Sequence, residues 1–172
     1  MAQHLILPGS LTAAYTDTQY TTKALLPRVG DTYYDQANAK AYIFLKNTGS
    51  SAIPAKTVAT ALTTAKSSFT CELPAATNDL PFAGARVSGA TSLAQNEYGW
   101  FQVKGSATLL ADAAGTTAEK HCVTSNATAG RVETQSSTYA VAMGPATVFG
   151  IAETTTTTGD VVVSLVGNVW GI

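Results

Sequence analysis

Residues 98–105 read Tyr98-Gly99-Trp100-Phe101-Gln102-Val103-Lys104-Gly105, and this stretch decides the fold class. Successive side chains of a β-strand point to opposite faces, so Phe101 and Val103 share one face. We expect both of them to lie in a hydrophobic core. Trp100 then lies on the other face, where it either covers a contact between subunits or packs at the edge of a barrel. The alternation predicts a strand that is buried on one face at least.

Other short runs along the chain have the composition of strands, because they are rich in apolar and β-branched residues and are bounded by turn residues. Together with 100–104 these runs are 41–46, 67–73, 85–88, 107–110, 120–124, 131–134, 147–153 and 161–166. Glycine or asparagine stands where turns are expected, at 47–49, 104–106, 129–130 and 158–160. The candidate helix 56–67 is interrupted by β-branched residues. The pattern predicts an all-β fold, a compact β-barrel or β-sandwich of short antiparallel strands, with an exposed threonine-rich hairpin tip at 154–158.

Residues 1–30 differ from the rest of the chain, because they contain Pro8 and Pro27 and show no alternation of apolar and polar positions. We expect an extended N-terminal arm over 1–30, followed by a single domain over 31–172. An arm that cannot bury a face of its own orders by lying on a neighbour, and Tyr15 and Tyr20 would suit such docking. The alternative is an N-terminal strand of the same domain. The sequence shows no repeat of fixed period and no linker that divides the chain.

The surface is expected to carry few charges, because only 12% of the 172 residues are charged while 45% are hydrophobic. A typical soluble domain has about 25% charged residues. A weakly charged surface has little repulsion to keep copies apart, so it suits a chain that packs against other chains. The 10 basic and 11 acidic residues are not gathered into blocks, so we expect neither nucleic acid nor a membrane as a partner.

The ends of the sequence favour synthesis in a cytoplasm. The first ten residues lack the basic start of a signal peptide, and the apolar stretch 161–172 is much shorter than the roughly 20 residues that span a bilayer. A reducing cytoplasm would keep Cys71 and Cys122 as thiols. We expect both cysteines to be small buried residues.

The sequence carries no recognisable catalytic motif: it lacks a nucleophile elbow, a phosphate loop, a dinucleotide fingerprint and a C-x-x-C pair. His4 lies in the expected arm. His121 and Cys122 are neighbours in an expected strand, so they point to opposite faces and cannot bind one metal together. The scattered acidic residues do not indicate a glycosidase pair. We therefore expect a protein that is not an enzyme, with no catalytic residues, no metal site and no cofactor.

A series of glycine and aromatic motifs, from about Gly84 to Leu165, resembles a known family. The motifs are 98–105, 107–110, 128–132, 148–153 and 161–165, and 30–32 with 40–46 look like the opening of the same kind of domain. Their order resembles the small head decoration, or cement, proteins that are encoded beside the major capsid protein in tailed-phage genomes. The long threonine-rich stretch at the N-terminus departs from the minimal barrel of that family.

The resemblance implies a structural virion protein that binds the outer surface of the capsid and stabilises the head. Its partners would be the major capsid protein and further copies of itself in a homotrimer. The candidate interface residues are Tyr15, Tyr20, Tyr98, Trp100 and Trp170. Two alternatives stay open: a phage tail-fibre or baseplate β-domain, which should show repeats or a stalk pattern, and a carbohydrate-binding β-sandwich module, in which Tyr98 and Trp100 would be exposed stacking platforms.

Overall fold

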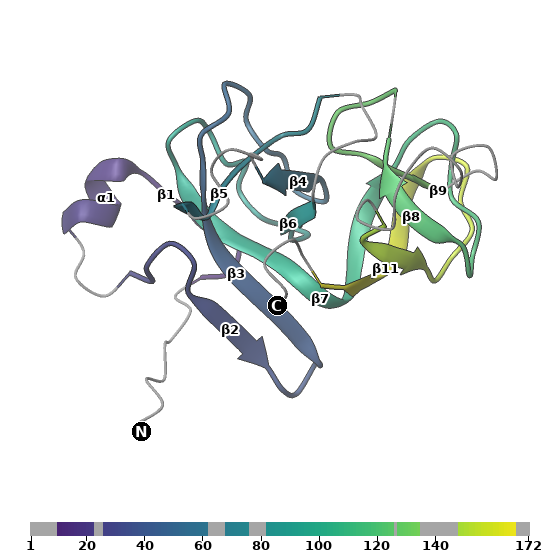
Figure 1. Cartoon of the computed structure of the whole chain (residues 1–172), viewed down its shortest axis with the longest axis horizontal. Coiled ribbons are helices and arrows are strands. Elements are labelled where there is room, and N and C mark those ends of the chain that lie inside the picture. Colours follow the sequence, from purple (N-terminus) through teal and green to yellow (C-terminus); the bar gives the residue numbers. More distant parts are fainter. Residues whose placement is uncertain are drawn as a thin grey trace.

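The computed structural model describes residues 10–22, 26–61, 68–75, 82–125, 127–134 and 148–167. These residues form a mixed sheet of eleven strands and one short helix, which confirms the all-β expectation (Figure 1). The elements are β1 (Ala14–Tyr15), α1 (Asp17–Thr22), β2 (Thr32–Asp35), β3 (Lys40–Asn47), β4 (Val58–Ala61), β5 (Thr70–Glu72), β6 (Phe82–Arg86), β7 (Tyr98–Ala111), β8 (His121–Thr124), β9 (Val132–Thr134), β10 (Gly150–Ala152) and β11 (Gly159–Val166).

The sheet closes on itself twice, and the long strand β7 belongs to both closures. The first part of β7 pairs with β3 and β6, β6 pairs with β4, β4 with β5, and β5 with β3. The second part of β7 pairs with β11 and β9, β9 pairs with β8, β8 with β10, and β10 with β11. We refer to these five-stranded closures as the N-terminal unit and the C-terminal unit. The pairs β3–β5 and β7–β9 are parallel and the other strand pairs are antiparallel, so the sheet is mixed.

The two units have the same connectivity. The five strands in chain order are β3 to β7 in the N-terminal unit and β7 to β11 in the C-terminal unit. In each unit the first strand pairs antiparallel with the last strand and parallel with the third strand. The second strand of each unit pairs with both the third and the fourth strand. An isolated bridge stands at the same place in each unit, Ile53 with Leu93 and Thr116 with Thr156. In both units the turn before the second strand contains a residue with positive φ, which is Lys56 in the N-terminal unit and Glu119 in the C-terminal unit. The chain is therefore a tandem repeat of one strand arrangement.

The repeat also keeps its spacing along the chain. The interval from Lys56 to Glu119 equals the intervals from Ile53 to Thr116 and from Leu93 to Thr156. The sequence shows no repeat because what is repeated is backbone pairing and turn geometry, and the side chains at equivalent positions differ.

Each unit has a hydrophobic interior. Phe101 and Val103 are fully buried in the N-terminal unit, as the alternation in 98–105 predicts. Leu109 and Val163 lie in the interior of the C-terminal unit. Cys71 and Cys122 are buried free thiols, as expected, and burial raises the pKa of both, that of Cys122 to about 12.

Several local expectations need correction. Strands β1, β2 and β4 and helix α1 were not expected, and β6 begins and ends earlier than the expected run 85–88. The turn expected at 104–106 is absent, because β7 runs through it. Gly105 has φ +83°, and a β-carbon there would lie 2.6 Å from the carbonyl oxygen of Ala39. Glycine is needed at position 105 for this close approach and not for a chain reversal. The hairpin between β10 and β11 is observed, and most of its threonine tip is exposed.

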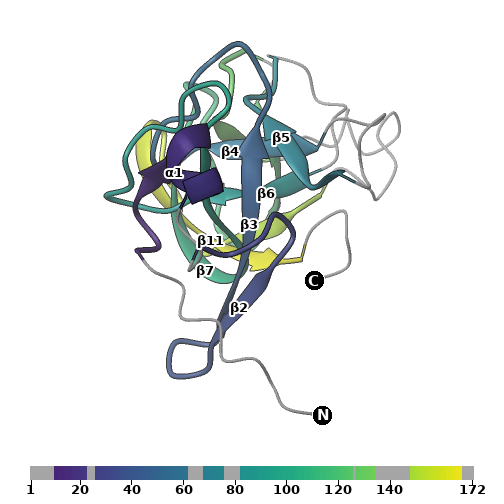
Figure 2. The ribbon, with the colours of Figure 1, turned by 90° about the vertical axis from the view of Figure 1, so that its left-hand side faces the viewer.

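The elements outside the two units lie on or beside the N-terminal unit. Helix α1 lies at one end of the long axis in Figure 1, and β8 and β9 of the C-terminal unit lie toward the other end. Strand β2 extends the sheet along β3 as a hairpin that projects from the body (Figure 2). Among the described residues, no helix is long and apolar enough to cross a membrane.

Candidate functional site

The predicted interface residues gather at one place, on the outer face of the N-terminal unit. Tyr98 and Trp100 project from β7 on the side opposite Phe101, and Tyr15 and Tyr20 pack against them. Trp170 falls outside the residues that the structure describes. Trp100 is 0% exposed and Tyr98 is 5% exposed, so neither side chain presents an open contact surface. Of the two interpretations of Trp100, packing within the chain is the one that the structure supports.

Two neighbouring strands supply the floor of this aromatic cluster. Phe44 on β3 lies directly opposite Trp100 on β7, and their rings meet edge to face with centroids 5.3 Å apart. Tyr42, two residues before Phe44, faces the same side and packs against Tyr33 of β2, with ring centroids 6.1 Å apart. The alternation of aromatic residues in 41–46 is a sequence signal that could have identified Tyr42 and Phe44.

The N-terminal strap, which we define as residues 10–22, covers the cluster. Strand β1 pairs with the start of β7, with Ala14 opposite Gly99 and Tyr15 opposite Tyr98. The ring of Tyr20 stacks on that of Tyr98, with centroids 4.0 Å apart and planes 10° apart. Tyr15 and Tyr20 therefore contact their own chain. Whether 1–30 forms an arm separate from a domain at 31–172 stays a prediction.

Helix α1 places Tyr20 over Tyr98, and the local sequence explains why the helix begins where it does. The Gln19 backbone N–H donates to the Thr16 hydroxyl, and the Thr16 backbone N–H donates to the Gln19 side chain, at 3.3 and 3.0 Å. This reciprocal pair is a capping box, which satisfies two backbone donors at a helix start. Asp17 in the first turn complements the helix dipole.

A polar contact joins the strap to the sheet beside the stacked tyrosines. The Tyr98 hydroxyl donates to Asp17 at 2.6 Å, and the Lys46 ammonium lies 3.3 Å from the same carboxylate oxygen. The hydrogen bond from Tyr98 and the bond from Lys46 lower the pKa of Asp17. Burial and the hydrogen bond to Asp17 raise the pKa of Tyr98. The contact therefore favours an ionised Asp17 beside a neutral Tyr98.

We expect Asp17→Asn to lower stability slightly at neutral pH and to have no effect in strong acid. Because the folded pKa of Asp17 is lowered, its contribution is complete above the unfolded pKa of about 3.9 and is lost as the pH falls through the folded pKa. Thermal unfolding from about pH 2 to pH 7 measures the difference from wild type. Tyr98→Phe tests the same contact from the other partner, because it keeps the stacked ring and removes only the hydroxyl that donates to Asp17. An Asp17→Asn difference that stays constant across this range would contradict the assignment.

Arg86 holds the strap from beneath and was not identified from the sequence. Its side chain is 0% exposed, and its guanidinium donates to the carbonyl oxygens of Trp100, Ala13 and Thr91 at 2.9 Å each, with a longer bond to Thr12. Burial lowers the pKa of Arg86 to about 10, which still leaves it charged at neutral pH. A single arginine at the end of the otherwise apolar run Phe82–Arg86 is the sequence signal that could have revealed it.

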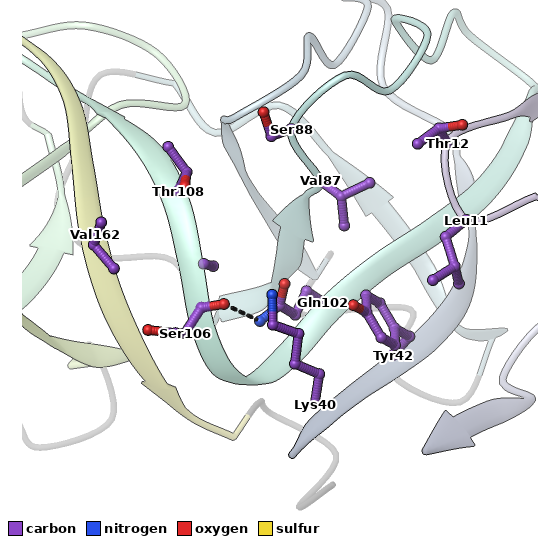
Figure 3. A pocket seen from close by; sticks show the side chains of 11 residues that line it. Leu11, Thr12, Lys40, Tyr42, Val87, Ser88, Gln102, Ser106, Thr108 and Val162 are labelled. Carbon is purple, nitrogen blue, oxygen red and sulfur yellow. Dashed lines mark hydrogen bonds between the residues drawn. The ribbon is translucent and has the colours of Figure 1, made fainter. Parts of the chain in front are cut away.

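A groove of about 420 Å³ lies where the strap, the N-terminal unit and the C-terminal unit meet (Figure 3). Leu11 of the strap lines one side, and Thr108 and Val162 of the C-terminal unit line the other. The side-chain amide of Gln102 braces the bend in β7 by donating to the carbonyl oxygens of Lys104, Gly105 and Ser106. No group of three or more potential metal ligands occurs in the part of the chain that the structure describes.

The described residues thus define an all-β protein with two similarly connected units and an aromatic cluster closed by its own strap. No protein-family model matches this chain, and no curated protein sequence matches it. Among solved structures, it is similar to the head fiber gp8.5 N base of bacteriophage phi29, with a TM-score of 0.47 and 12% sequence identity. The alignment covers 76% of this chain and 98% of that chain.

Proposed function

We propose that this chain is a structural protein of a tailed-phage virion, a decoration protein that binds the outer surface of the capsid and stabilises the head. Binding alone would perform this function, because each copy that bridges neighbouring capsid subunits adds interface area that opposes their separation. Many symmetric copies provide avidity even where one contact is weak.

The observation that carries the proposal is the place of the family-like motifs in the fold. The motifs 98–105 and 107–110 together form nearly all of β7, 148–153 contains β10, and 161–165 lies within β11. The motif 128–132 forms the turn that leads into β9. The resemblance to head decoration proteins therefore falls mainly on strands of the C-terminal unit, including the shared strand β7, and its opening stretch 40–46 lies in β3 of the N-terminal unit.

The carbohydrate-binding alternative loses its structural basis. A stacking platform needs aromatic faces that are open to a sugar, but Trp100 and Tyr98 are buried among Tyr33, Phe44 and Tyr20. The tail-fibre or baseplate alternative gains some support, because the two units repeat one connectivity within the chain. The experiment below therefore distinguishes the tail-fibre or baseplate alternative from the proposed function.

The test uses heads of the encoding phage that were made without this protein and have expanded and packaged DNA. Purified full-length chain should bind these heads at a fixed number of copies, and cryo-electron microscopy should show added density on the outer capsid surface. Bound heads should release DNA at a higher temperature than bare heads, which a dye that fluoresces on exposed DNA reports.

Unexpanded heads are the control, because the resemblance implies that the protein is added after the shell expands. Density at the tail or baseplate of wild-type virions, with none on the head, would overturn the proposal in favour of the tail alternative. Absence of the protein from purified virions would overturn both.

A further inference from the structure

The C-terminal unit has an outer face that corresponds to the strap-covered face of the N-terminal unit. The Thr48 N–H bonds to Cys71 and the Asp112 N–H bonds to Val132, so these two residues occupy equivalent positions in the two units. Phe44 lies four residues before Thr48, and Thr108 lies four residues before Asp112, so Phe44 and Thr108 are equivalent. The partner of Phe44 across the sheet is Trp100, and the partner of Thr108 is Val162.

The covering of these equivalent faces differs. In the N-terminal unit Phe44 and Trp100 are fully buried, whereas in the C-terminal unit Thr108 and Val162 remain partly exposed. The open face is formed by the outward residues of β7, β11 and β10. The groove lies between this open face and the strap-covered face, with Leu11 on one side and Thr108 and Val162 on the other (Figure 3).

Exposed apolar side chains gather on this open face. Among the described residues only three large hydrophobic side chains are exposed, and two of them, Ile151 at 39% and Val166 at 62%, lie here. Ile151 is opposite Ser164, and Val166 follows Ser164 on the same side of β11. The third, Tyr34 at 59%, lies on the β2 hairpin. Exposed apolar side chains that cluster indicate an interaction site more than scattered ones do.

The charges at the border of this face suit a second copy of the same chain. Asp160 is already paired with Lys56 at 2.6 Å, and Glu153 accepts a hydrogen bond from Ser106. Lys104, opposite Val166, is exposed. A two-fold interface brings identical patches together, so the patch must be neutral or carry both signs. This face has an apolar centre, and the charged residues near its border carry both signs, so two copies of the face are compatible in charge. These charged residues are Asp160 and Glu153 on the acidic side and Lys56 and Lys104 on the basic side.

We propose that two copies of the chain associate through the outer face of the C-terminal unit, around Ile151, Val162 and Val166, with two-fold symmetry. This interface is distinct from the aromatic cluster that the sequence indicates, and the proposed dimer is an alternative to the homotrimer that the family resemblance implies. The association does not require a capsid, so it can be tested separately from the proposed function.

Sedimentation velocity of the full chain at up to roughly 100 µM tests the proposal, because that concentration populates even a dimer with a Kd near 10 µM. Wild type should sediment as a dimer, and Ile151→Glu combined with Val166→Glu should weaken the dimer at least tenfold. Tyr34→Glu is the matched control for the single variant Val166→Glu, because it adds one negative charge at the third exposed apolar residue, and it should leave the dimer intact.

Both substituted side chains are exposed, so the melting temperature of the double variant should stay close to that of the wild-type subunit. Val166→Glu alone provides a milder variant if the double variant does not fold. A wild-type monomer, a wild-type trimer, or a dimer that persists in a folded Val166→Glu variant as strongly as in Tyr34→Glu would each overturn the proposal.

Discussion

Trp100→Ala is expected to lower the free energy of unfolding by about 3–5 kcal/mol, the usual cost of deleting a large buried aromatic side chain. Trp100 is completely buried between Phe44 and Tyr33, and the strap closes the cluster above it. Removal of the indole leaves a cavity that rigid strands on both sides cannot close. Urea denaturation followed by circular dichroism measures the loss, which is a large part of the roughly 5–15 kcal/mol that stabilises a typical domain.

Phe101→Ala and Tyr34→Ala are the buried and the exposed comparison for the Trp100→Ala result. Phe101 is as fully buried as Trp100 but faces the interior of the N-terminal unit, so its truncation should cost about the same. Tyr34 is exposed, and its truncation should stay within about 0.5 kcal/mol of wild type. A Trp100→Ala variant that unfolds like wild type but assembles poorly would show that the indole acts in an interface between chains.

Arg86→Met is expected to lower the free energy of unfolding by about 3 kcal/mol or more and to release the strap. The substitution keeps much of the buried volume but removes every donor to the carbonyl oxygens of Trp100, Ala13 and Thr91. Each buried acceptor that loses its partner costs about 1–3 kcal/mol. Removal of the buried charge offsets part of this loss, because burial already disfavours the charged form of Arg86.

Two measurements separate the effects of Arg86→Met. Urea denaturation reports global stability, and limited proteolysis reports whether residues 10–22 become accessible before the units unfold. Arg86→Lys should not restore the wild-type behaviour, because one ammonium group cannot reproduce the fork of donors that a guanidinium provides. Wild-type stability of Arg86→Met would mean that the hydrogen bonds only balance the cost of burying the charge.

The sequence predicts the parts of the fold that depend on local alternation. The period of two in 98–105 identifies the first part of β7 and assigns Phe101 and Val103 correctly to the interior, and the apolar, β-branched composition of 161–166 identifies β11. Short strands such as β1 and β4 were missed because two to four residues carry too little periodicity. Tertiary pairing defines these strands, since their hydrogen-bond partners come from distant parts of the chain.

In the candidate site too, the sequence identifies residues and tertiary contacts decide what covers them. Tyr15, Tyr20, Tyr98 and Trp100 were all identified from the sequence, and the structure brings them together. The sequence could not decide whether the strap or another molecule covers Trp100, because alternation places a side chain on a face without naming what lies above it. Arg86 is an example of a contact that local alternation cannot reveal. The four carbonyl oxygens that accept its hydrogen bonds come from three separate segments of the chain.

The sequence by itself therefore determined that this is an all-β chain with a weakly charged surface and buried thiols, since these properties follow from composition and from the period of two along each strand. Only the tertiary structure decided that the sheet closes twice into units of the same connectivity and that the strap seals one outer face and leaves the other open. Closure and covering depend on pairings such as Ala111 with Val132 and Tyr15 with Tyr98, which join residues far apart in the chain. Such pairings leave no periodic trace in the residues that they connect.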